Sequence, residues 1–298
     1  MGATHDMLRT LFTMATAVEA RDPYTGGHLW RVSQFSHLLA EEAGLSTEEQ
    51  ARVALGGFLH DLGKIGVPDA ILNKPEKLTD EEYAVIKTHP GIGQRLLQSH
   101  PLAGLVIEAV HAHHERPDGR GYPRSLSAEG ISIDARIVSI CDAFDAMTSS
   151  RPYRRGMPID KALAIIRENL GTQFDRKLGE RFISLGERGE LAHVVGHSEP
   201  GIPLQNCPNC GPTIVVSREQ KPGDHVYCRV CGSEAKLVRG GQGLGIESTG
   251  FKGGPDDLAP VADEALIERL LGNAQRLLAS RRLPLLRRVY VRLFGQDD

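Results

Sequence analysis

Apolar side chains in the first two thirds of the chain recur at helical spacing. The first predicted helix has one apolar face, made by Leu8, Leu11, Phe12, Ala15 and Val18. The same spacing returns at residues 32–39 and 162–166. Residues 46–49 and 79–82 have the pattern of a capping box, which begins a helix. The chain is therefore predicted to be mainly α, with a compact all-helical domain over residues 1–197.

The pattern changes after about residue 190. Residues 198–204 contain two prolines and a glycine, which predict a linker. Short apolar runs at 213–217, 225–227 and 235–238 predict strands. Together these strands predict a small β domain over residues 205–240.

Two further segments follow the predicted β domain. Glycine is frequent in residues 241–262, which predicts a flexible linker. Residues 263–294 return to helical spacing and predict an amphipathic tail that Pro284 divides. The second half of the tail is basic, through Arg281, Arg282, Arg287, Arg288 and Arg292. Such a helix packs on its own protein or on a second copy, or binds an anionic membrane surface or nucleic acid. The sequence leaves these alternatives open.

Length and charge narrow the class of protein. The 298 residues allow one large core with small appendages, and the formal net charge of -3 gives no overall nucleic-acid signature. No apolar run reaches the roughly 18 residues of a membrane span, and no basic segment followed by an apolar stretch marks a signal peptide. We therefore expect a cytoplasmic protein.

Four of the five cysteines form two C-x-x-C pairs. The pairs are Cys207 with Cys210 and Cys228 with Cys231, and 17 residues separate them. Four thiolates at this spacing hold one structural Zn²⁺ in a zinc ribbon. Redox-active pairs are the alternative, but neither pair lies in a βαβ context. The pattern thus predicts a zinc-ribbon-like module, tethered to a helical domain that is complete near residue 198.

Histidines and aspartates in the first half of the chain predict a second kind of metal site. Eight of the twelve histidines fall between His28 and His114, and a lone histidine would ordinarily be only a satisfied polar residue. His60 and Asp61, however, are adjacent within an apolar run, where an unpaired charge is costly unless a cation offsets it. Imidazoles and carboxylates together can hold two divalent cations, with Asp61 as a bridge.

Eight ordered motifs between about residues 5 and 190 extend this prediction. They are 19–28 (EARDPYTGGH), 60–64 (HDLGK), 74–79 (KPEKLT), 87–90 (KTHP), 113–123 (HHERPDGRGYP), 141–148 (CDAFDAMT), 151–154 (RPYR) and 174–175 (FD). Through these motifs the chain resembles the HD-GYP phosphodiesterases of bacterial cyclic di-GMP signalling. The resemblance implies an all-helical HD-type metallohydrolase domain and a phosphodiesterase that hydrolyses cyclic di-GMP to linear pGpG. Further cleavage to GMP is left open.

The resemblance also implies a set of metal ligands. One cation would bind His28, His60, Asp61 and Asp142, and the second would bind Asp61, His89, His113 and His114. Iron or manganese would suit these donors. Relatives with a third metal carry a glutamate where this chain has Tyr24, and a phenol is a poorer ligand, so two metals are expected.

Other residues are implied to act on the substrate. Lys64 follows Asp61 by one helical turn and would place a cation at the phosphate or leaving oxygen. Tyr122 would contact the nucleotide, and Arg151 and Arg154 its phosphates, because arginine can donate two hydrogen bonds to one phosphate. Asp145 would orient one of these groups or a ligand histidine. Each of them could instead be an ordinary surface or loop residue.

Two alternatives to cyclic di-GMP hydrolysis stay open. The same metal pair would serve a hydrolase of another cyclic dinucleotide or nucleotide. The domain could also be a non-catalytic sensor of cyclic di-GMP, or dock a partner protein through its Gly-Tyr-Pro loop; intact ligands and Lys64 argue against this. A homodimer, or a signalling protein bound at the loop, ribbon or tail, is a further expectation.

Overall fold

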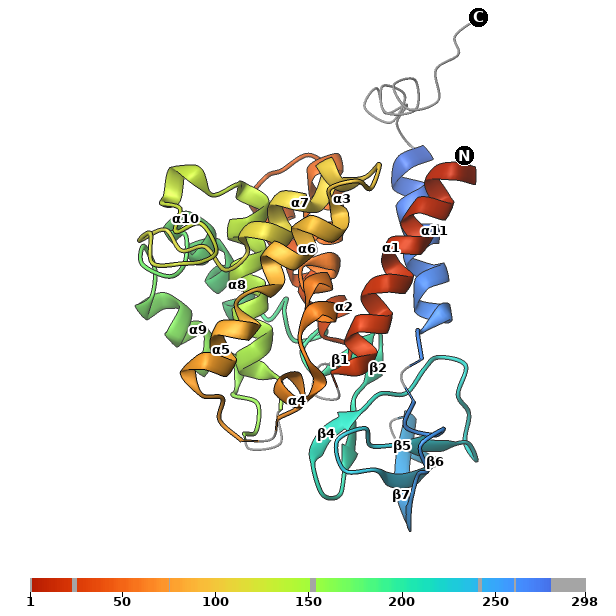
Figure 1. The fold of residues 1–298 in the computed structure, drawn as a ribbon. Coiled ribbons are helices and arrows are strands. Elements are labelled where there is room, and N and C mark those ends of the chain that lie inside the picture. Colours follow the sequence, from red (N-terminus) through yellow and green to blue (C-terminus); the bar gives the residue numbers. More distant parts are fainter. Residues whose placement is uncertain are drawn as a thin grey trace, which may run out of the picture.

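The computed structural model describes residues 2–22, 26–74, 76–150, 154–240, 243–259 and 261–279 (Figure 1). Its α-helices are α1 (Gly2–Arg21), α2 (His28–Glu42), α3 (Thr47–Leu59), α4 (Asp69–Leu72), α5 (Asp80–Ile86), α6 (His89–Leu97), α7 (Ala103–Ala112), α8 (Ile133–Thr148), α9 (Ile159–Glu168), α10 (Arg176–Glu187) and α11 (Glu264–Ala279). Two 3-10 helices are η1 (Leu62–Gly66) and η2 (Ala128–Gly130). The mainly α fold predicted from the apolar spacing is confirmed.

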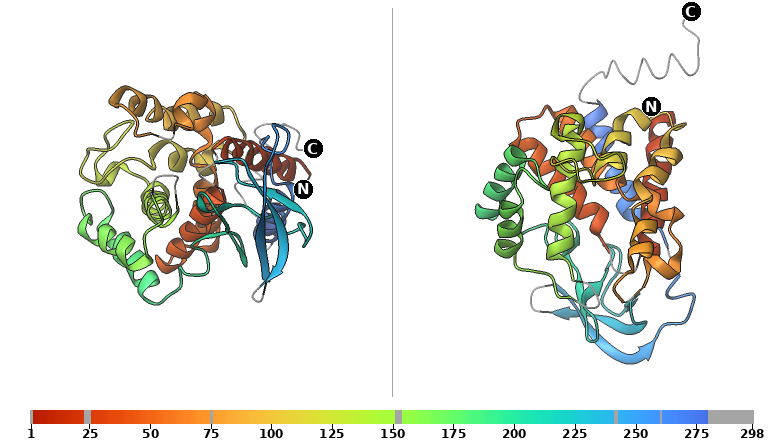
Figure 2. Two further views of the ribbon diagram at one scale, coloured as in Figure 1. Left: turned by 90° about the horizontal axis from the view of Figure 1, so that it is seen from below. Right: turned by 60° about the vertical axis from the view of Figure 1, so that its left-hand side comes forward.

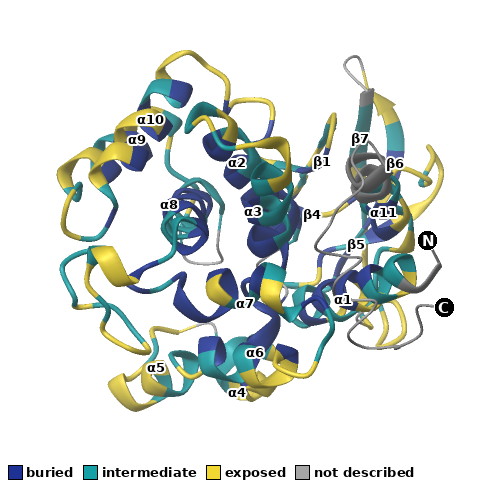
Figure 3. Ribbon diagram, turned by 90° about the horizontal axis from the view of Figure 1, so that it is seen from above, coloured by how far each residue is buried: buried dark blue, intermediate teal, exposed yellow. Residues whose placement is uncertain are grey.

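Helix α8 lies at the centre of the helical domain, with α2, α3, α7 and α9 around it (Figure 2 and Figure 3). Its Phe144 makes edge-to-face contacts with Phe35 of α2 and Phe182 of α10, at centroid distances of 5.2 and 5.0 Å. Such aromatic pairs stabilise a core beyond the burial of their area. Because α8 is fixed on several sides, its two aspartates, Asp142 and Asp145, have defined positions.

Both predicted capping boxes begin helices. The side chain of Ser46 accepts a hydrogen bond from the backbone of Glu49 at the start of α3, and Glu49 binds back to the backbone of Ser46. Thr79 and Glu82 repeat the arrangement at the start of α5. Each box satisfies backbone donors that the first turn of a helix leaves without partners.

Among the described residues, seven strands follow α10: β1 (His197–Glu199), β2 (Ile202–Pro203), β3 (Gln205–Cys207), β4 (Gly211–Ile214), β5 (His225–Tyr227), β6 (Ser233–Gly240) and β7 (Gly243–Lys252). β1 pairs with β2, β3 with β4, and β5, β6 and β7 form one antiparallel sheet in that order. We call residues 205–252 the ribbon. It has its own small core, made by Cys207, Ile214, Val216, Val226, Cys228, Ala235 and Leu237.

The structure contradicts the linker prediction for residues 198–204 and, in part, the one for residues 241–262. Residues 198–204 belong to the β1–β2 hairpin. Residues 243–252 form β7, which pairs with β6 and extends the β domain beyond residue 240. The glycines obscure the alternation of apolar with small or polar residues that marks a strand. Leu244 and Ile246 pack against the ribbon core at strand spacing.

Helix α11 lies beside α1 and completes the core of the helical domain (Figure 1). Leu266, Ile267 and Leu271 are buried in that core, so the domain is not complete at residue 198, contrary to the prediction. The described half of the tail thus packs on its own protein. The arginines of its second half lie outside the described residues: Arg281, Arg282, Arg287, Arg288 and Arg292. None of the described helices is both long and apolar enough to cross a membrane.

Candidate metal centre

All seven predicted ligands of the His/Asp site converge on one place inside the helical domain, which we call the metal centre. His28 and His89 begin α2 and α6, while α8 carries Asp142. The remaining four follow α3 or α7: His60, Asp61, His113 and His114. Ligand atoms lie within 4.8 Å of one another in three groups: His28, His60 and Asp142; His89, His113 and His114; and His60, Asp61 and His113.

The first group surrounds a space of the size of one cation. Nε2 of His28 lies 3.3 Å from Nε2 of His60 and 3.5 Å from Oδ1 of Asp142. Donors bound at right angles, each about 2.1 Å from a cation, are roughly 3 Å apart. The three side chains therefore fit a shared divalent ion without rearrangement.

The second group has the same spacing with imidazoles alone. Nε2 of His89 lies 3.2 Å from Nε2 of His113. The His114 ring is 4.1 Å from that of His113 and 5.1 Å from that of His89, centroid to centroid. Three imidazoles held this closely fit a second cation, because neutral histidines supply lone pairs to a metal ion.

Asp61 lies between the two groups and faces each with a different oxygen. Its Oδ2 is 3.3 Å from Nε2 of His60 and 3.5 Å from Nε2 of His28, in the first group. Its Oδ1 is 3.5 Å from Nε2 of His89, in the second. This orientation fits a carboxylate that bridges two metal ions.

Hydrogen bonds outside the centre orient four of its imidazoles. A backbone carbonyl can only accept, so a ring nitrogen bonded to one must carry a proton, and in the neutral ring the opposite nitrogen presents a lone pair. Nδ1 of each ring makes this outer bond, and Nε2 faces inward. The pairs are His28 with Asp145 at 2.8 Å, His60 with Gly57 O at 2.7 Å, His89 with Ile86 O at 2.8 Å and His113 with Val110 O at 3.0 Å.

The pKa values of the histidines differ between the two groups of ligands. Burial and neighbouring imidazoles hold the pKa of His113 well below its usual value and lower that of His114 to about 3, which keeps both rings neutral. Burial also opposes charge on His28, but the carboxylates of Asp145 and Asp61 outweigh it and raise the pKa of His28 to about 10. The acidic side of the centre thus attracts positive charge.

Asp145 contacts a ligand histidine rather than solvent. It is 1% exposed and accepts from Nδ1 of His28, from Nε of Arg31 at 2.6 Å and from Nη2 of Arg31 at 3.0 Å. Asp145 thus lies against a candidate ligand histidine, and its role in orienting that ring stays a prediction. No role was predicted for Arg31, because an arginine that is 1% exposed inside a helix is rare.

Glu19 is a second residue that the sequence analysis passed over, although it begins the first motif. Its Oε1 accepts the backbone N–H of Leu29 at 2.9 Å, so it satisfies a free donor in the first turn of α2. Burial raises the pKa of Glu19 to about 7. Because His28 directly precedes Leu29, Glu19 fixes the end of the helix that carries this ligand.

Lys64 lies against the bridging carboxylate. Its Nζ is 2.7 Å from Oδ2 of Asp61 and 3.9 Å from Oδ2 of Asp22. Burial disfavours its charge, yet the attraction of Asp61 and Asp22 raises the pKa of Lys64 to about 12. Lys64 thus favours its charged form beside the metal centre, and its action on the phosphate or leaving oxygen stays a prediction.

The less buried side of the centre carries Tyr122. Of the grouped ligands, His114 and Asp142 are the two that are only partly buried. The Tyr122 ring stacks on that of His114, with centroids 4.7 Å apart and planes inclined by 27°. Burial raises the pKa of the Tyr122 phenol, which stays neutral. Tyr122 thus lies beside the less buried ligands, and its contact with a nucleotide stays a prediction.

The predicted phosphate-binding arginines are only partly described. Arg154 is half-buried, and its guanidinium donates to the backbone carbonyl of Ala146 in α8. Arg151 and Tyr24 lie outside the described residues. The role of Arg154 and Arg151 in phosphate binding stays a prediction.

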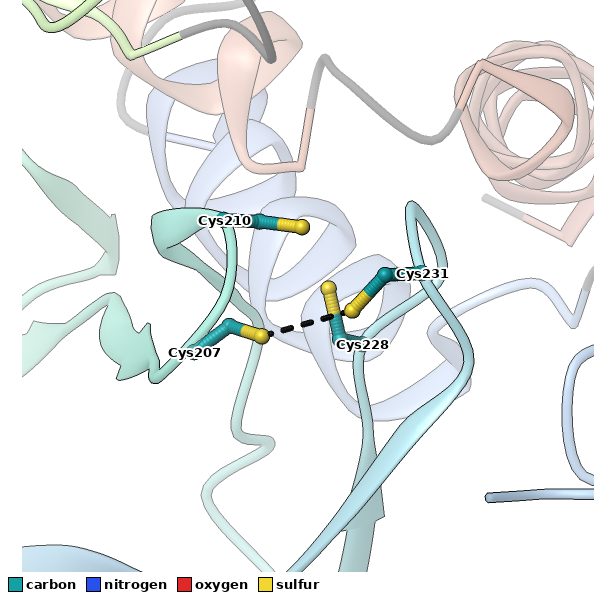
Figure 4. Close-up of side chains that lie close together, drawn as sticks. All are labelled: Cys207, Cys210, Cys228 and Cys231. Carbon is teal, nitrogen blue, oxygen red and sulfur yellow. Dashed lines mark hydrogen bonds between the residues drawn. The ribbon is translucent and has the colours of Figure 1, made fainter.

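The four paired cysteines meet at one end of the ribbon, on the turns after β3 and β5 (Figure 4). Their Sγ atoms all lie within 4.8 Å of one another, and those of Cys207 and Cys231 are 3.5 Å apart. Thiolates placed tetrahedrally about 2.3 Å from Zn²⁺ have nearly this separation. Hydrogen bonds from Ser233 outweigh burial and lower the pKa of the Cys231 thiol to about 6, which favours the thiolate. The donor set and its geometry fit zinc.

Comparison with known proteins places the helical domain in a family. The cyclic di-GMP phosphodiesterase response regulator RpfG of Xanthomonas campestris pv. campestris is 40% identical over 200 residues, covering 65% of this chain and 52% of the relative. The 3'3'-cGAMP-specific phosphodiesterase 3 of Vibrio cholerae is 41% identical over 158 residues, covering 53% of this chain and 34% of the relative. The chain thus spans between a third and about half of the length of these relatives.

A solved structure and a family profile complete the comparison. The structure of Bd1817, an HDG"Y"P protein from Bdellovibrio bacteriovorus, superposes with a TM-score of 0.47 at 24% identity, over 56% of this chain and 53% of that one. The profile of the HD domain matches residues 13–178, which contain all seven ligands of the metal centre. The chain belongs to the HD domain family.

Proposed function

We propose that this protein is a metal-dependent phosphodiesterase that hydrolyses cyclic di-GMP to linear pGpG in bacterial second-messenger signalling, with further cleavage to GMP left open. The observation that carries the proposal is the placement of Asp61, with one oxygen toward His60 and the other toward His89. A carboxylate between two groups of imidazoles is what a two-metal hydrolase requires. Relatives that are named as cyclic dinucleotide phosphodiesterases support the choice of substrate class.

We assign two iron or manganese ions to the centre. Imidazole nitrogens and carboxylate oxygens suit both metals. Such a metal pair, when bound, activates water and neutralises phosphoryl oxygens. The chain contributes Asp61 and the imidazoles that hold the ions, Lys64 as a fixed cation for the developing charge, and Tyr122 as a surface for the nucleotide. Arg151 and Arg154 are assigned to the phosphates.

Cyclic GMP-AMP is a second candidate substrate. The relative of Vibrio cholerae described above is named as specific for 3'3'-cGAMP and is as similar to this chain as RpfG is. The metal centre recognises phosphate rather than base, so it does not distinguish the two nucleotides. A non-catalytic sensor is less favoured, because the whole ligand set and Lys64 are present and close together.

The experiment is a turnover assay after anaerobic reconstitution. Protein stripped of metal is loaded with Mn²⁺ or Fe²⁺ and mixed in parallel with cyclic di-GMP, 3'3'-cGAMP and cyclic di-AMP, and products are separated by chromatography. We expect linear pGpG from cyclic di-GMP, and no product without metal. Binding of cyclic di-GMP without any product, at full metal loading, would favour the sensor. Faster cleavage of 3'3'-cGAMP would favour the second candidate.

We further propose one structural Zn²⁺ in the ribbon and a cytoplasmic location, where reduced cysteines bind metal rather than form disulfides. All five cysteines are free of disulfides in the structure. A homodimer, a signalling partner at the Gly-Tyr-Pro loop, ribbon or tail, and contact of the tail with membrane or nucleic acid stay predictions.

A further inference from the structure

The ribbon touches the helical domain at the two described ends of the connection between α1 and α2. At the first end, Nη1 of Arg229 donates to the carbonyl of Ala20 at 3.1 Å. Arg229 stands between Cys228 and Cys231, on the turn that carries half of the zinc ligands. At the second end, the side chain of Val215, just after β4, lies against Gly26.

Both contacts lie next to groups that hold His28. Ala20 follows Glu19, whose carboxylate binds the first turn of α2 at Leu29 N and lies close enough to Arg229 to attract it. The backbone of Ala20 also leads directly to Asp22, whose Oδ2 is 3.9 Å from Lys64. Ala20, which Arg229 contacts, therefore lies two residues before Asp22, and Asp22 faces Lys64 beside the metal centre.

The second contact is tighter. A methyl group added at Gly26 would overlap Cγ2 of Val215. Gly26 cannot shift freely, because its carbonyl accepts from Nη1 of Arg31 at 2.9 Å, and Arg31 also binds Asp145. Gly27 has φ of 72°, a left-handed value that favours glycine, and the Cα of Ser198 closes the space beside it. Any displacement of Gly26 thus passes to His28, two residues along.

We propose that the ribbon is part of the scaffold of the metal centre, and that Arg229 and Val215 are positioning residues for His28. They touch neither the metal ligands nor the space between them. They fix the chain on both sides of the α1–α2 connection, and so the first ligand of the centre. The inference rests on the proposed function only in that it assigns metal ions to this centre.

The test is a double-mutant cycle in the full chain. Gly26→Ala introduces the overlap with Val215, Val215→Ala removes the opposing methyl groups, and the double variant combines both. Gly104→Ala is the matched control, because a methyl group there meets nothing within 4 Å. The readouts are the affinity for Mn²⁺, the electron paramagnetic resonance spectrum of bound Mn²⁺, and kcat and KM separately.

We expect Gly26→Ala to weaken Mn²⁺ binding by about tenfold, as changes to groups that orient metal ligands do. The double variant should return to within about threefold of Val215→Ala, because only contacting residues couple. Arg229→Ala should weaken binding severalfold while Arg229→Lys, which keeps a cation and a donor, should restore it. Mn²⁺ spectra should change with Gly26→Ala and recover in the double variant.

Two results would overturn the inference: Gly26→Ala with unchanged Mn²⁺ affinity, or a loss that Val215→Ala does not relieve. Unchanged affinity would mean that the ribbon moves to accommodate the added methyl group and that this movement does not affect the metal centre. The second would mean that Gly26 acts within its own loop. Failure of the proposed function would look different: the wild-type chain would bind two Mn²⁺ ions but cleave no cyclic dinucleotide. The double-mutant cycle, which is read from Mn²⁺ affinity, would still test the inference in that case.

Discussion

The two candidate metal sites of this chain are assembled in opposite ways. The four cysteines of the ribbon come from two tight turns between Cys207 and Cys231. The seven ligands of the metal centre come from helices spread between His28 and Asp142 and meet only because α8 lies in the middle of the domain. A local site is fixed by a few turns, whereas a dispersed site depends on the packing of the whole domain.

The two candidate sites also differ in the donors that they offer to a metal ion. Four thiolates complete a tetrahedral zinc site, which leaves no position for water or substrate. In the metal centre Asp61 is shared, so each group of three ligands reaches four donors only with its help. Iron and manganese accept more than four donors, and the free positions are where a reaction takes place. We therefore expect the cysteine site to stabilise the ribbon and the His/Asp site to support a reaction.

The largest expected effect comes from removing the shared ligand. Asp61→Ala should abolish binding of both ions and lower turnover by about a thousandfold or more, because a bridging carboxylate serves each ion. Circular dichroism should show nearly unchanged helical content, and elemental analysis should show the loss of both Mn²⁺ ions with the ribbon zinc retained.

Asp6→Ala is the control for Asp61→Ala, since the Asp6 side chain is 78% exposed and far from the centre in sequence. It should keep metal and activity. An Asp61→Ala protein with full metal content and undiminished hydrolysis would contradict the assignment of the centre.

The next effect concerns rate rather than metal. Lys64→Met should lower kcat by about a hundredfold with little change in KM, because a fixed cation acts mainly on the charge that develops in the transition state. Metal content should be measured alongside, since Lys64 also contacts the bridging Asp61. Lys77→Met, at an exposed position, serves as control. A change confined to KM would make Lys64 a substrate-binding group instead.

A smaller effect should reach the centre from the other site. Cys207→Ser combined with Cys228→Ser should lose zinc and unfold the ribbon, whose small core is insufficient without metal. Because the ribbon contacts Ala20 and Gly26, Mn²⁺ affinity of the centre should then fall about tenfold. Lys236→Ser, exposed on β6, should do neither. Zinc loss without any change in Mn²⁺ affinity would separate the two sites.

The features predicted correctly from the sequence are those set by short residue spacings or by the ordered motifs. Both capping boxes, the cysteine turns and the convergence of the ligand histidines agree with the structure. The sequence-based prediction missed β7, because glycines at Gly243 and Gly245 hid the strand alternation. It also missed Arg31, whose burial is offset only by Asp145, a residue far along the chain. Contacts such as that of Val215 with Gly26 arise from tertiary packing, which no local pattern encodes.

The smallest effect on catalysis is expected from truncating Leu271 of α11, a core residue that is not a ligand of either metal site. Leu271 is 1% exposed in the main core, so Leu271→Ala should lower the free energy of unfolding by about 2–4 kcal/mol through lost burial and a cavity. Leu270→Ala, which removes a partly buried neighbour on the same helix, should cost clearly less. Chemical denaturation measures both, and kcat at 25 °C should stay at the wild-type value. Equal losses for the two variants would mean that α11 is not docked on α1 as described, and a fall in kcat would make the helix a third element on which the metal centre depends.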